Sequence, residues 1–258
     1  MGVVAATGAF IIRHAEPVMG TVVSFDVRPQ GIPAVRARAA LREACHVLHR
    51  ADATFSLYRP DSAMSQVRRG RLSLDDAPAE IAEVLGLCAQ VRDMSDGWFD
   101  PWAMPGGIDP TGLVKGWAAG RAVSVLCAAG VGAAMINAAG DIGVFGEPGS
   151  QRPWRIGVRS SDAPDELCCV VEPTGAVATS GQYERGPHVV NPKTGKPADT
   201  VRSATVCGSD LAVADALATG LLAAGAAGLA MVAAAGYEAM IIGADKVLRH
   251  TDGFPIVG

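Results

Sequence analysis

The sequence predicts one large α+β unit in which packed helices cover a mixed β-sheet. Two observations favour this class. The chain has 258 residues, of which 49% are hydrophobic and 19% charged, so it can bury a sizeable core. Apolar runs of strand and helix type also follow one another without a regular β-α-β rhythm. No linker divides the chain, so we expect one domain over residues 1–258, with residues 1–18 as a poorly defined N-terminal extension.

The first half of the chain is expected to supply one strand and three helices. Residues 21–27 alternate apolar and polar side chains as a strand does, and residues 34–53 place their apolar side chains on a helical period. A helix at about residues 78–94 begins with proline and carries an acid in its first turn. The irregular segment 95–112 is a long loop of the kind that is usually functional, and a helix over 113–129 follows it.

The second half is expected to be richer in short strands. A helix over 211–222 and a second alanine-rich helix accompany strands at 133–137, 154–158, 168–171, 176–178, 203–207 and 238–242. Residues 216–237 carry no charge, but they are mostly alanine and glycine and lack flanking lysine or arginine. We therefore interpret this stretch as two short packed helices broken around Gly225 and Gly228, not as a membrane span.

Composition excludes several classes of protein. The net charge is −4 and no run of lysine or arginine occurs, which argues against a nucleic-acid partner. The six cysteines form no CxxC pair, so we interpret them as small buried hydrophobic residues. No basic residue precedes the apolar N-terminal stretch and no lipid-attachment cysteine lies near it, so we expect a cytoplasmic protein.

Asp215 and Thr219 are the first candidate site residues. They lie four residues apart on an expected helix, so their side chains share one face. A carboxylate and a hydroxyl suit a hard cation such as Mg²⁺, which is usually shared with phosphate. A chance pair or a helix cap would look the same, but Asp215 lies in an apolar stretch with no basic residue one turn away.

Two further segments carry residue types that suit phosphate chemistry. The segment from Asp109 to Gly116 joins the irregular loop to a helix, whose first N–H groups favour an anion, and Lys115 adds positive charge. His188 is a candidate general base because the pKa of histidine lies near neutrality. Considered singly, a segment like the first is more often a surface helix start with a solvated lysine, and a lone histidine is more often an ordinary packed or surface residue.

The order and spacing of these segments, together with others, resemble one family. The motifs are Met19-Gly20-Thr21, Phe55-Ser56-Leu57-Tyr58, Gly97-Trp98-Phe99-Asp100-Pro101, Asp109…Lys115-Gly116, Asn137-Ala138-Ala139-Gly140-Asp141, Ala178-Thr179-Ser180-Gly181, His188…Asn191-Pro192…Thr194-Gly195 and Ala214-Asp215-Ala216…Thr219. From about Met19 to its end, the chain is similar to the ApbE family, the FAD:protein FMN transferases.

The resemblance implies roles for individual residues. Asp215 and Thr219 would bind magnesium through their side chains, and Gly112 through its main-chain carbonyl. His188 would be the catalytic base, and Tyr58 would lie against the isoalloxazine ring of FAD. The other residues expected around FAD are Met19, Trp98, Phe99, Asp100, Asp109, Lys115, Thr179 and Val190.

The implied reaction moves FMN from FAD to a serine or threonine hydroxyl of an acceptor flavoprotein and releases AMP. FAD pyrophosphatase activity and non-catalytic FAD binding or delivery remain the alternatives. Two departures from the family pattern bear on them. Ala139 stands where the family usually has glycine, at a position that needs close backbone approach or an unusual conformation. Asn191 replaces the commoner aspartate and removes a charge near His188.

Overall fold

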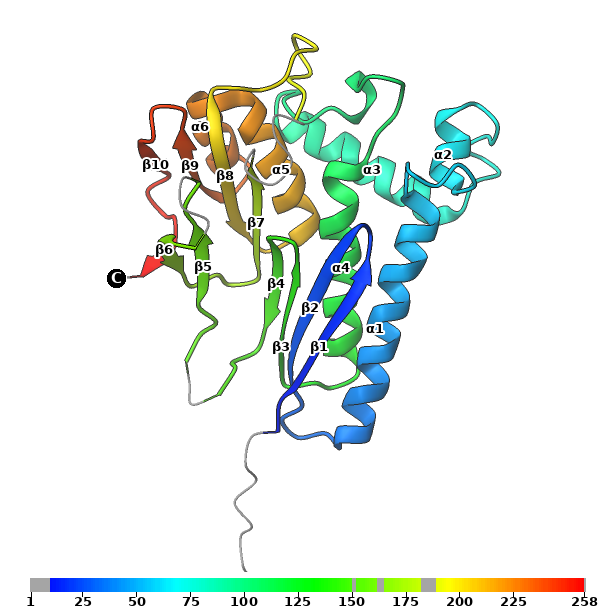
Figure 1. Ribbon diagram of the computed structural model, residues 1–258, viewed down its shortest axis with the longest axis vertical. Coiled ribbons are helices and arrows are strands. Elements are labelled where there is room, and N and C mark those ends of the chain that lie inside the picture. The colour runs from blue at the N-terminus through cyan, green and yellow to red at the C-terminus, as the bar shows by residue number, and fades with distance from the viewer. Residues whose placement is uncertain (1–9, 150–151, 162–164, 182–188, 258) are drawn as a thin grey trace, which may run out of the picture.

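The computed structural model describes residues 10–149, 152–161, 165–181 and 189–257. Its large sheet runs in the order β1 (Ile12–Val18), β2 (Thr21–Arg28), β3 (Ala133–Ala138), β4 (Asp141–Phe145), β7 (Ala176–Gly181), β8 (Val201–Gly208), β9 (Glu238–Gly243) and β10 (Leu248–His250) (Figure 1). The α+β class is confirmed. The expectation of a mixed sheet was wrong, because every described strand pairing is antiparallel.

A smaller sheet covers part of one face of the large one. It contains β11 (Ile256–Val257), β6 (Leu167–Val171) and β5 (Ile156–Arg159), in that order. Side chains from both sheets form a compact apolar layer between them, with Ile142 and Val177 on the large sheet and Val158 on the small one. Strand alternation produces this arrangement, because successive side chains point to opposite faces.

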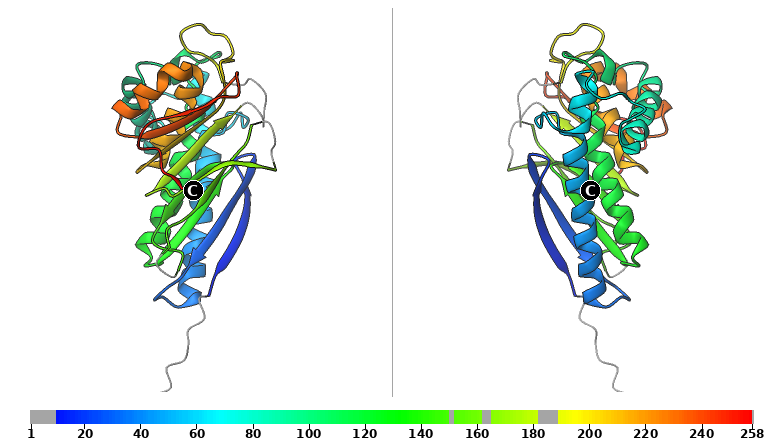
Figure 2. Two further views of the ribbon diagram at one scale, coloured as in Figure 1. Left: turned by 90° about the vertical axis from the view of Figure 1, so that its left-hand side faces the viewer. Right: turned by 90° about the vertical axis from the view of Figure 1, so that its right-hand side faces the viewer.

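Helices cover the other face of the large sheet. They are α1 (Ala34–Phe55), α2 (Ala63–Arg68), α3 (Ala79–Met94), α4 (Thr111–Ala128), α5 (Leu211–Ala224) and α6 (Gly228–Ala234), with one-turn helices η1 (Pro101–Ala103) and η2 (Gly225–Ala227). Their buried side chains and the covered sheet face form the main core. The rotated views show α1 and α4 running beside the β1–β2 hairpin (Figure 2).

The uncharged C-terminal stretch is a core element. Leu211–Ala234 is long and apolar enough to cross a membrane by composition, yet more than half of it is buried inside the fold. Gly225 ends α5 with φ of +75°, a conformation that favours glycine. The expected break into two packed helices is confirmed.

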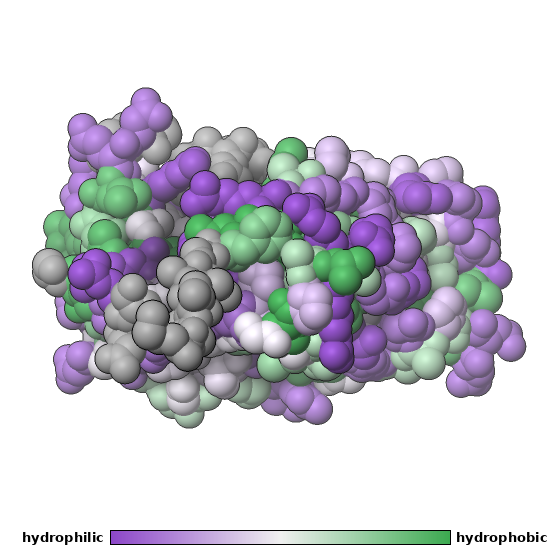
Figure 3. Space-filling model, turned by 90° about the horizontal axis from the view of Figure 1, so that it is seen from below, coloured by the Kyte–Doolittle hydropathy of each residue, from purple (hydrophilic) through white to green (hydrophobic). Residues whose placement is uncertain are grey.

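Seen from below, the surface shows small groups of apolar residues among polar ones (Figure 3).

Some elements differ from those expected. Residues 1–18 were expected to be poorly defined, but Ile12–Val18 pair with β2 as an edge strand. The short elements α2, β4, β10 and β11 were not predicted from the sequence. Among the cysteines, Cys45, Cys88 and Cys207 are buried as expected, but Cys127 is exposed.

The turns and loops that carry most of the quoted motifs gather at one end of the large sheet. The β1–β2 turn and the β3–β4 turn share this end, because Val23 pairs with Ala138. The segment after residue 189 meets the long loop before α4, where Lys193 Nζ lies 4.1 Å from the centre of the Trp98 ring. Motifs distant in sequence therefore meet in space.

Candidate active site

A pair of buried carboxylates lies where α4, α5 and β4 meet. Asp215 on α5 is 4% exposed, and Asp141 at the start of β4 is 1% exposed. The Gly116 amide of α4 donates to Asp215 Oδ2 at 2.9 Å. Lys115 Nζ forms an ion pair with Asp141 Oδ2. Among the described residues, two potential negative charges thus share the one positive charge of Lys115.

Burial governs the protonation of this pair. It raises the pKa of Asp215 well above its usual range, and the neighbouring Asp141 carboxylate adds to the rise. Burial also raises the pKa of Asp141, although the Lys115 ammonium partly offsets the effect. Within the described residues, neither Asp141 oxygen has a hydrogen bond of good geometry. If both carboxyl groups were ionised, the pair would carry one more negative charge than the Lys115 ammonium balances, and this cost is why their pKa values are raised.

The other expected metal ligands lie one helical turn from Asp215 and across the α4–α5 interface. Thr219 Oγ1 is 3.2 Å from Ser180 Oγ of β7. A Cβ built on Gly112 would lie 3.4 Å from Thr219 Oγ1, so the start of α4 approaches this hydroxyl closely. The structure thus places Gly112 of α4 beside Thr219 of α5, and Thr219 shares one face of α5 with Asp215.

These residues suit a hard divalent cation. Carboxylate, hydroxyl and main-chain carbonyl oxygens are its preferred ligands. Asp141 has no hydrogen bond of good geometry among the described residues besides its ion pair with Lys115, and Asp215 is a second buried acid beside it, so a further positive charge would be stabilised here. Mg²⁺ therefore fits this set of donors.

Asp141 and Gly116 belong to this cluster, although neither was expected from the sequence as a site residue. Asp141 ends a quoted motif, but no local pattern shows that β4 carries it toward Lys115. A Cβ on Gly116 would lie 2.5 Å from the Leu211 carbonyl oxygen and 2.7 Å from Asp215 Cβ. Only glycine lets α4 and α5 approach closely enough for the Gly116–Asp215 hydrogen bond.

The long loop before α4 is held by its own polar side chains. Asp109 Oδ1 accepts from the Thr111 amide at 3.0 Å, and its Oδ2 lies 3.3 Å from Arg68 Nη1. Asp100 Oδ1 accepts from the Trp102 amide at 2.9 Å. Both carboxylates expected near FAD thus also fix the loop that leads into α4.

The aromatic pair of this loop divides between core and surface. Phe99 is buried, and its ring would lie 3.3 Å from a Cβ on Gly112, which brings it next to the proposed metal ligands. Trp98 is partly buried under Lys193. Phe99 therefore packs against the start of α4 beside the site. Trp98 contacts Lys193 and so connects the long loop before α4 with the segment after residue 189.

The remaining residues expected around FAD are spread along this end of the sheet. Tyr58 is 95% exposed, so its ring is accessible to a ligand. Met19 has φ of +55° in the β1–β2 turn, and Val190 forms an isolated bridge with Pro197. Thr179 Oγ1 lies 3.0 Å from Thr205 Oγ1. No described contact joins Tyr58, Met19 or Val190 to the carboxylate cluster.

His188 lies outside the described residues, so the structure does not test its expected role. Asn191 lies just beyond it and makes a turn of its own. Its Oδ1 accepts from the Lys193 amide at 2.9 Å, and its N–H donates to the Lys196 carbonyl at 2.8 Å. The amide side chain therefore serves the same turn-forming purpose as the aspartate it replaces.

A cavity of about 190 Å³ lies between the two sheets beside the β3–β4 turn. Asn137, Ala139 and Gly140 line it from the turn, Thr179 from β7 and Arg159 from the small sheet. Polar groups and a basic side chain thus face a hollow next to the carboxylate cluster. This cavity suits one part of a large polar ligand.

Ala139 has an unusual backbone conformation, which is one of the two reasons expected for the family's usual glycine at this position. Its φ is +53°, in the left-handed region, and the neighbouring Gly140 has φ of +96°. Gly140 donates its N–H to Asn137 Oδ1 at 2.9 Å, which closes the turn. The alanine therefore stores strain of about 1–2 kcal/mol at this turn.

Ala139→Gly is expected to stabilise the protein by about 0.5–1 kcal/mol. Relief of the strain outweighs the extra backbone entropy that glycine loses on folding, which is about 0.4–1 kcal/mol. Urea unfolding measures the change. Ala129→Gly is the matched control, because Ala129 has φ of −75° and should lose stability. If Ala139→Gly lost as much stability as Ala129→Gly, the backbone at Ala139 would not be strained.

Comparison with known proteins places this site in context. A model described as "ApbE family" matches residues 19–105 and 103–241. A curated relative from Rhodobacter capsulatus, named FAD:protein FMN transferase, is 35% identical over 154 residues, which are 56% of this chain and 28% of the relative. A relative of the same name from Vibrio cholerae serotype O1 is 30% identical over 159 residues, 57% of this chain and 46% of the relative. Less than half the length of each relative is therefore matched.

Solved structures share the fold over nearly the whole chain. The flavin transferase ApbE from Vibrio cholerae superposes with a TM-score of 0.82 at 21% identity, covering 95% of this chain and 97% of the other. The apo flavinyl transferase ApbE of Pseudomonas stutzeri gives 0.82 at 22% identity, covering 96% of each chain. At these identities the likeness establishes the architecture alone.

Proposed function

This chain belongs to the ApbE family, and from that premise we propose that it transfers FMN from FAD to an acceptor protein and releases AMP. One observation supports this reading most strongly. The buried pair Asp141 and Asp215, when ionised, has more negative charge than Lys115 balances, beside the hydroxyl of Thr219 and the backbone of Gly112. Such a site favours a divalent cation, which phosphoryl transfer from a dinucleotide requires.

Asp215 and Thr219 would hold Mg²⁺ through their side-chain oxygens, and Gly112 through its carbonyl. When bound there, the ion would supply positive charge to the pyrophosphate of FAD. The chain's own residues do the rest of the positioning. Gly116 donates to Asp215 and fixes the orientation of that carboxylate. Lys115 neutralises Asp141, so that charge repulsion does not displace Asp215.

FAD would extend from this cluster along the loop end of the sheet. The exposed ring of Tyr58 is available to stack on the isoalloxazine. Asp100 and Asp109 hold the loop that presents the start of α4. Thr179 and the β3–β4 turn line the cavity of about 190 Å³, which would accept a polar part of the ligand.

The transfer step needs a base and an acceptor hydroxyl. His188 would take the proton of a serine or threonine hydroxyl on an acceptor flavoprotein. The oxygen then forms a bond to the phosphorus on the riboflavin side, and the bond between that phosphorus and the bridging oxygen of the pyrophosphate breaks. AMP leaves with that oxygen, and FMN remains on the acceptor.

Incubation of the purified chain with FAD, Mg²⁺ and a candidate acceptor flavoprotein is expected to add one FMN to the acceptor, because the proposed site would hold the metal next to the pyrophosphate of FAD. Mass spectrometry detects the addition, and chromatography detects equimolar AMP. Removing Mg²⁺ with a chelator should stop both. His188→Ala should stop transfer while FAD still binds, as fluorescence titration would show.

The outcomes separate the alternatives. AMP and FMN appearing without any modified acceptor would assign the protein as an FAD pyrophosphatase, with water in place of the hydroxyl. Tight FAD binding with no AMP under any metal would instead indicate a binding or delivery protein. Loss of FAD binding in His188→Ala would show that His188 positions FAD and does not act as the base.

A further inference from the structure

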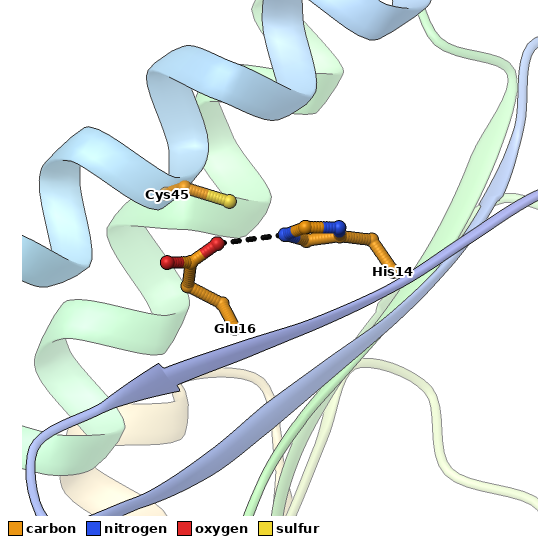
Figure 4. A group of neighbouring side chains, drawn as sticks. All are labelled: His14, Glu16 and Cys45. Atoms are coloured by element: carbon orange, nitrogen blue, oxygen red, sulfur yellow. Dashed lines mark hydrogen bonds and ion pairs between the residues drawn. The ribbon is translucent and has the colours of Figure 1, made fainter.

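A second cluster of metal-ligand side chains lies between β1 and α1. His14 and Glu16 are two residues apart on β1, so they point to the same face of the strand. Cys45 and His49 are four residues apart on α1, so they share one face of the helix. Figure 4 shows His14, Glu16 and Cys45 pointing toward one another from the two elements.

The donor atoms are already close. His14 Nε2 lies 2.7 Å from Glu16 Oε2, and His49 Nε2 lies 2.8 Å from Glu16 Oε1. One ligand atom each from His14, Glu16 and Cys45 lies within 4.8 Å of the other two. Because ligands of one zinc ion sit about 2.0–2.3 Å from it, small side-chain rotations suffice to surround an ion.

We propose that His14, Glu16 and Cys45 bind a zinc-class transition-metal ion, with His49 holding the second oxygen of Glu16. The donors are one imidazole nitrogen, one carboxylate oxygen and one sulfur, a set that suits Zn²⁺ or Co²⁺ and not Mg²⁺. A carboxylate fixed by a histidine is a common support of such sites. Water would complete a tetrahedral coordination.

Charge and protons balance in this site. Burial and the Glu16 carboxylate raise the pKa of the Cys45 thiol to about 12, so without metal the thiol keeps its proton. Binding forms the metal–sulfur bond and releases that proton to solvent. One thiolate and one carboxylate then neutralise a divalent ion, and neutral His14 adds no charge.

The site differs from the carboxylate cluster in chemistry and in place. The donors proposed for Mg²⁺ are all oxygens, held by α4 and α5. The ligands here join β1, the edge strand of the large sheet, to α1. A bound ion would therefore fasten the β1–β2 hairpin to the helical layer and raise the temperature of unfolding.

Cobalt titration of the untagged, chelator-treated chain tests the proposal. A thiolate ligand produces a charge-transfer band in the near ultraviolet, and tetrahedral Co²⁺ produces visible bands. Both are expected at one equivalent, and Zn²⁺ should abolish them by displacement. Cys45→Ser should lose the charge-transfer band, and His14→Ala should weaken binding at least about tenfold.

Matched variants locate the site. Cys127→Ser changes an exposed cysteine on α4, and His46→Ala changes an exposed histidine on α1 that lies 3.5 Å from Glu43. Both should bind cobalt as the parent chain does. Circular dichroism checks that each variant folds. If Cys45→Ser does not fold, the exposed His14→Ala variant decides the question.

Several results would overturn the proposal. These are the absence of a charge-transfer band in the parent chain, its persistence in folded Cys45→Ser, its loss in Cys127→Ser, and unchanged affinity in His14→Ala. Cobalt that produces no sulfur band but blocks Mg²⁺-dependent AMP release would show binding at the carboxylate cluster alone.

Discussion

Asp215→Asn is expected to lower AMP release by about a thousandfold, because it removes a charged ligand from a site where the metal supplies several kcal/mol to the transition state. The asparagine carbonyl oxygen can still accept from the Gly116 amide, so α4 and α5 should stay in register. Steady-state assays over a range of Mg²⁺ concentrations measure the loss. Recovery of full activity at high Mg²⁺ would show that Asp215 contributes to affinity only.

The same variant should fold at least as stably as the parent chain without metal. The pKa of Asp215 is raised, so the folded chain binds more protons than the unfolded chain between the ordinary pKa and the raised one. Below the ordinary pKa the carboxyl group is protonated in both states and costs no stability. As pH rises from the ordinary pKa through the raised one, the free energy of unfolding falls, because ionisation is unfavourable in the folded chain. Asparagine carries no such cost, so the gain should be larger at pH 8 than at pH 4.

Asp210→Asn is the matched control for Asp215→Asn. Asp210 Oδ1 caps α5 by accepting from the Val213 amide at 3.0 Å, and asparagine caps a helix equally well. Activity and stability should both stay close to those of the parent. Thermal unfolding with and without Mg²⁺ completes the comparison, because Mg²⁺ should stabilise the parent and Asp210→Asn but not Asp215→Asn.

Gly116→Ala is expected to destabilise the protein by about 3 kcal/mol or more. The added Cβ would lie 2.5 Å from the Leu211 carbonyl oxygen and 2.7 Å from Asp215 Cβ, so two packed helices must separate. Backbone atoms cannot move aside as a flexible side chain can. Urea unfolding measures the loss, and activity should fall with it because the hydrogen bond to Asp215 is disturbed.

Gly86→Ala makes the same substitution in another helix and should have the opposite sign. Nothing lies within 4 Å of a Cβ at this position on α3, so only helix propensity changes. A gain of about 1 kcal/mol is expected. If Gly116→Ala also gained stability, α4 and α5 would not pack as closely at Gly116 as the structure shows.

Most of the regular elements were predictable, because their signals are local. Helical periodicity gave α1 and α3, and alternation gave β2. The break at Gly225 was visible because glycine interrupts an alanine-rich helix. The short elements α2, β4, β10 and β11 were missed, since a few residues carry no readable period. The strand directions were also missed, because pairing depends on partners distant in sequence.

Some features of the candidate site could be predicted from the sequence, and others could not. That the side chains of Asp215 and Thr219 share one face follows from helix geometry, and the resemblance marks position 139 as one where the family's glycine serves close approach or an unusual conformation. That Asp141 faces Lys115 does not follow from any local pattern, because β4 and α4 are brought together only by packing. The cluster of His14, Glu16 and Cys45 was missed for the same reason, since its members come from two elements.

By itself, the sequence determined the helix faces, the break in the C-terminal helix and the resemblance to the ApbE family. The helix faces and the break depend on residues within a few positions of one another, whereas the resemblance depends on the order of eight motifs along the chain. Only the tertiary structure decided that two buried carboxylates share a single lysine, and that Gly116 must lack a side chain. Charge balance and close packing are properties of neighbours in space, and the fold alone makes those neighbours.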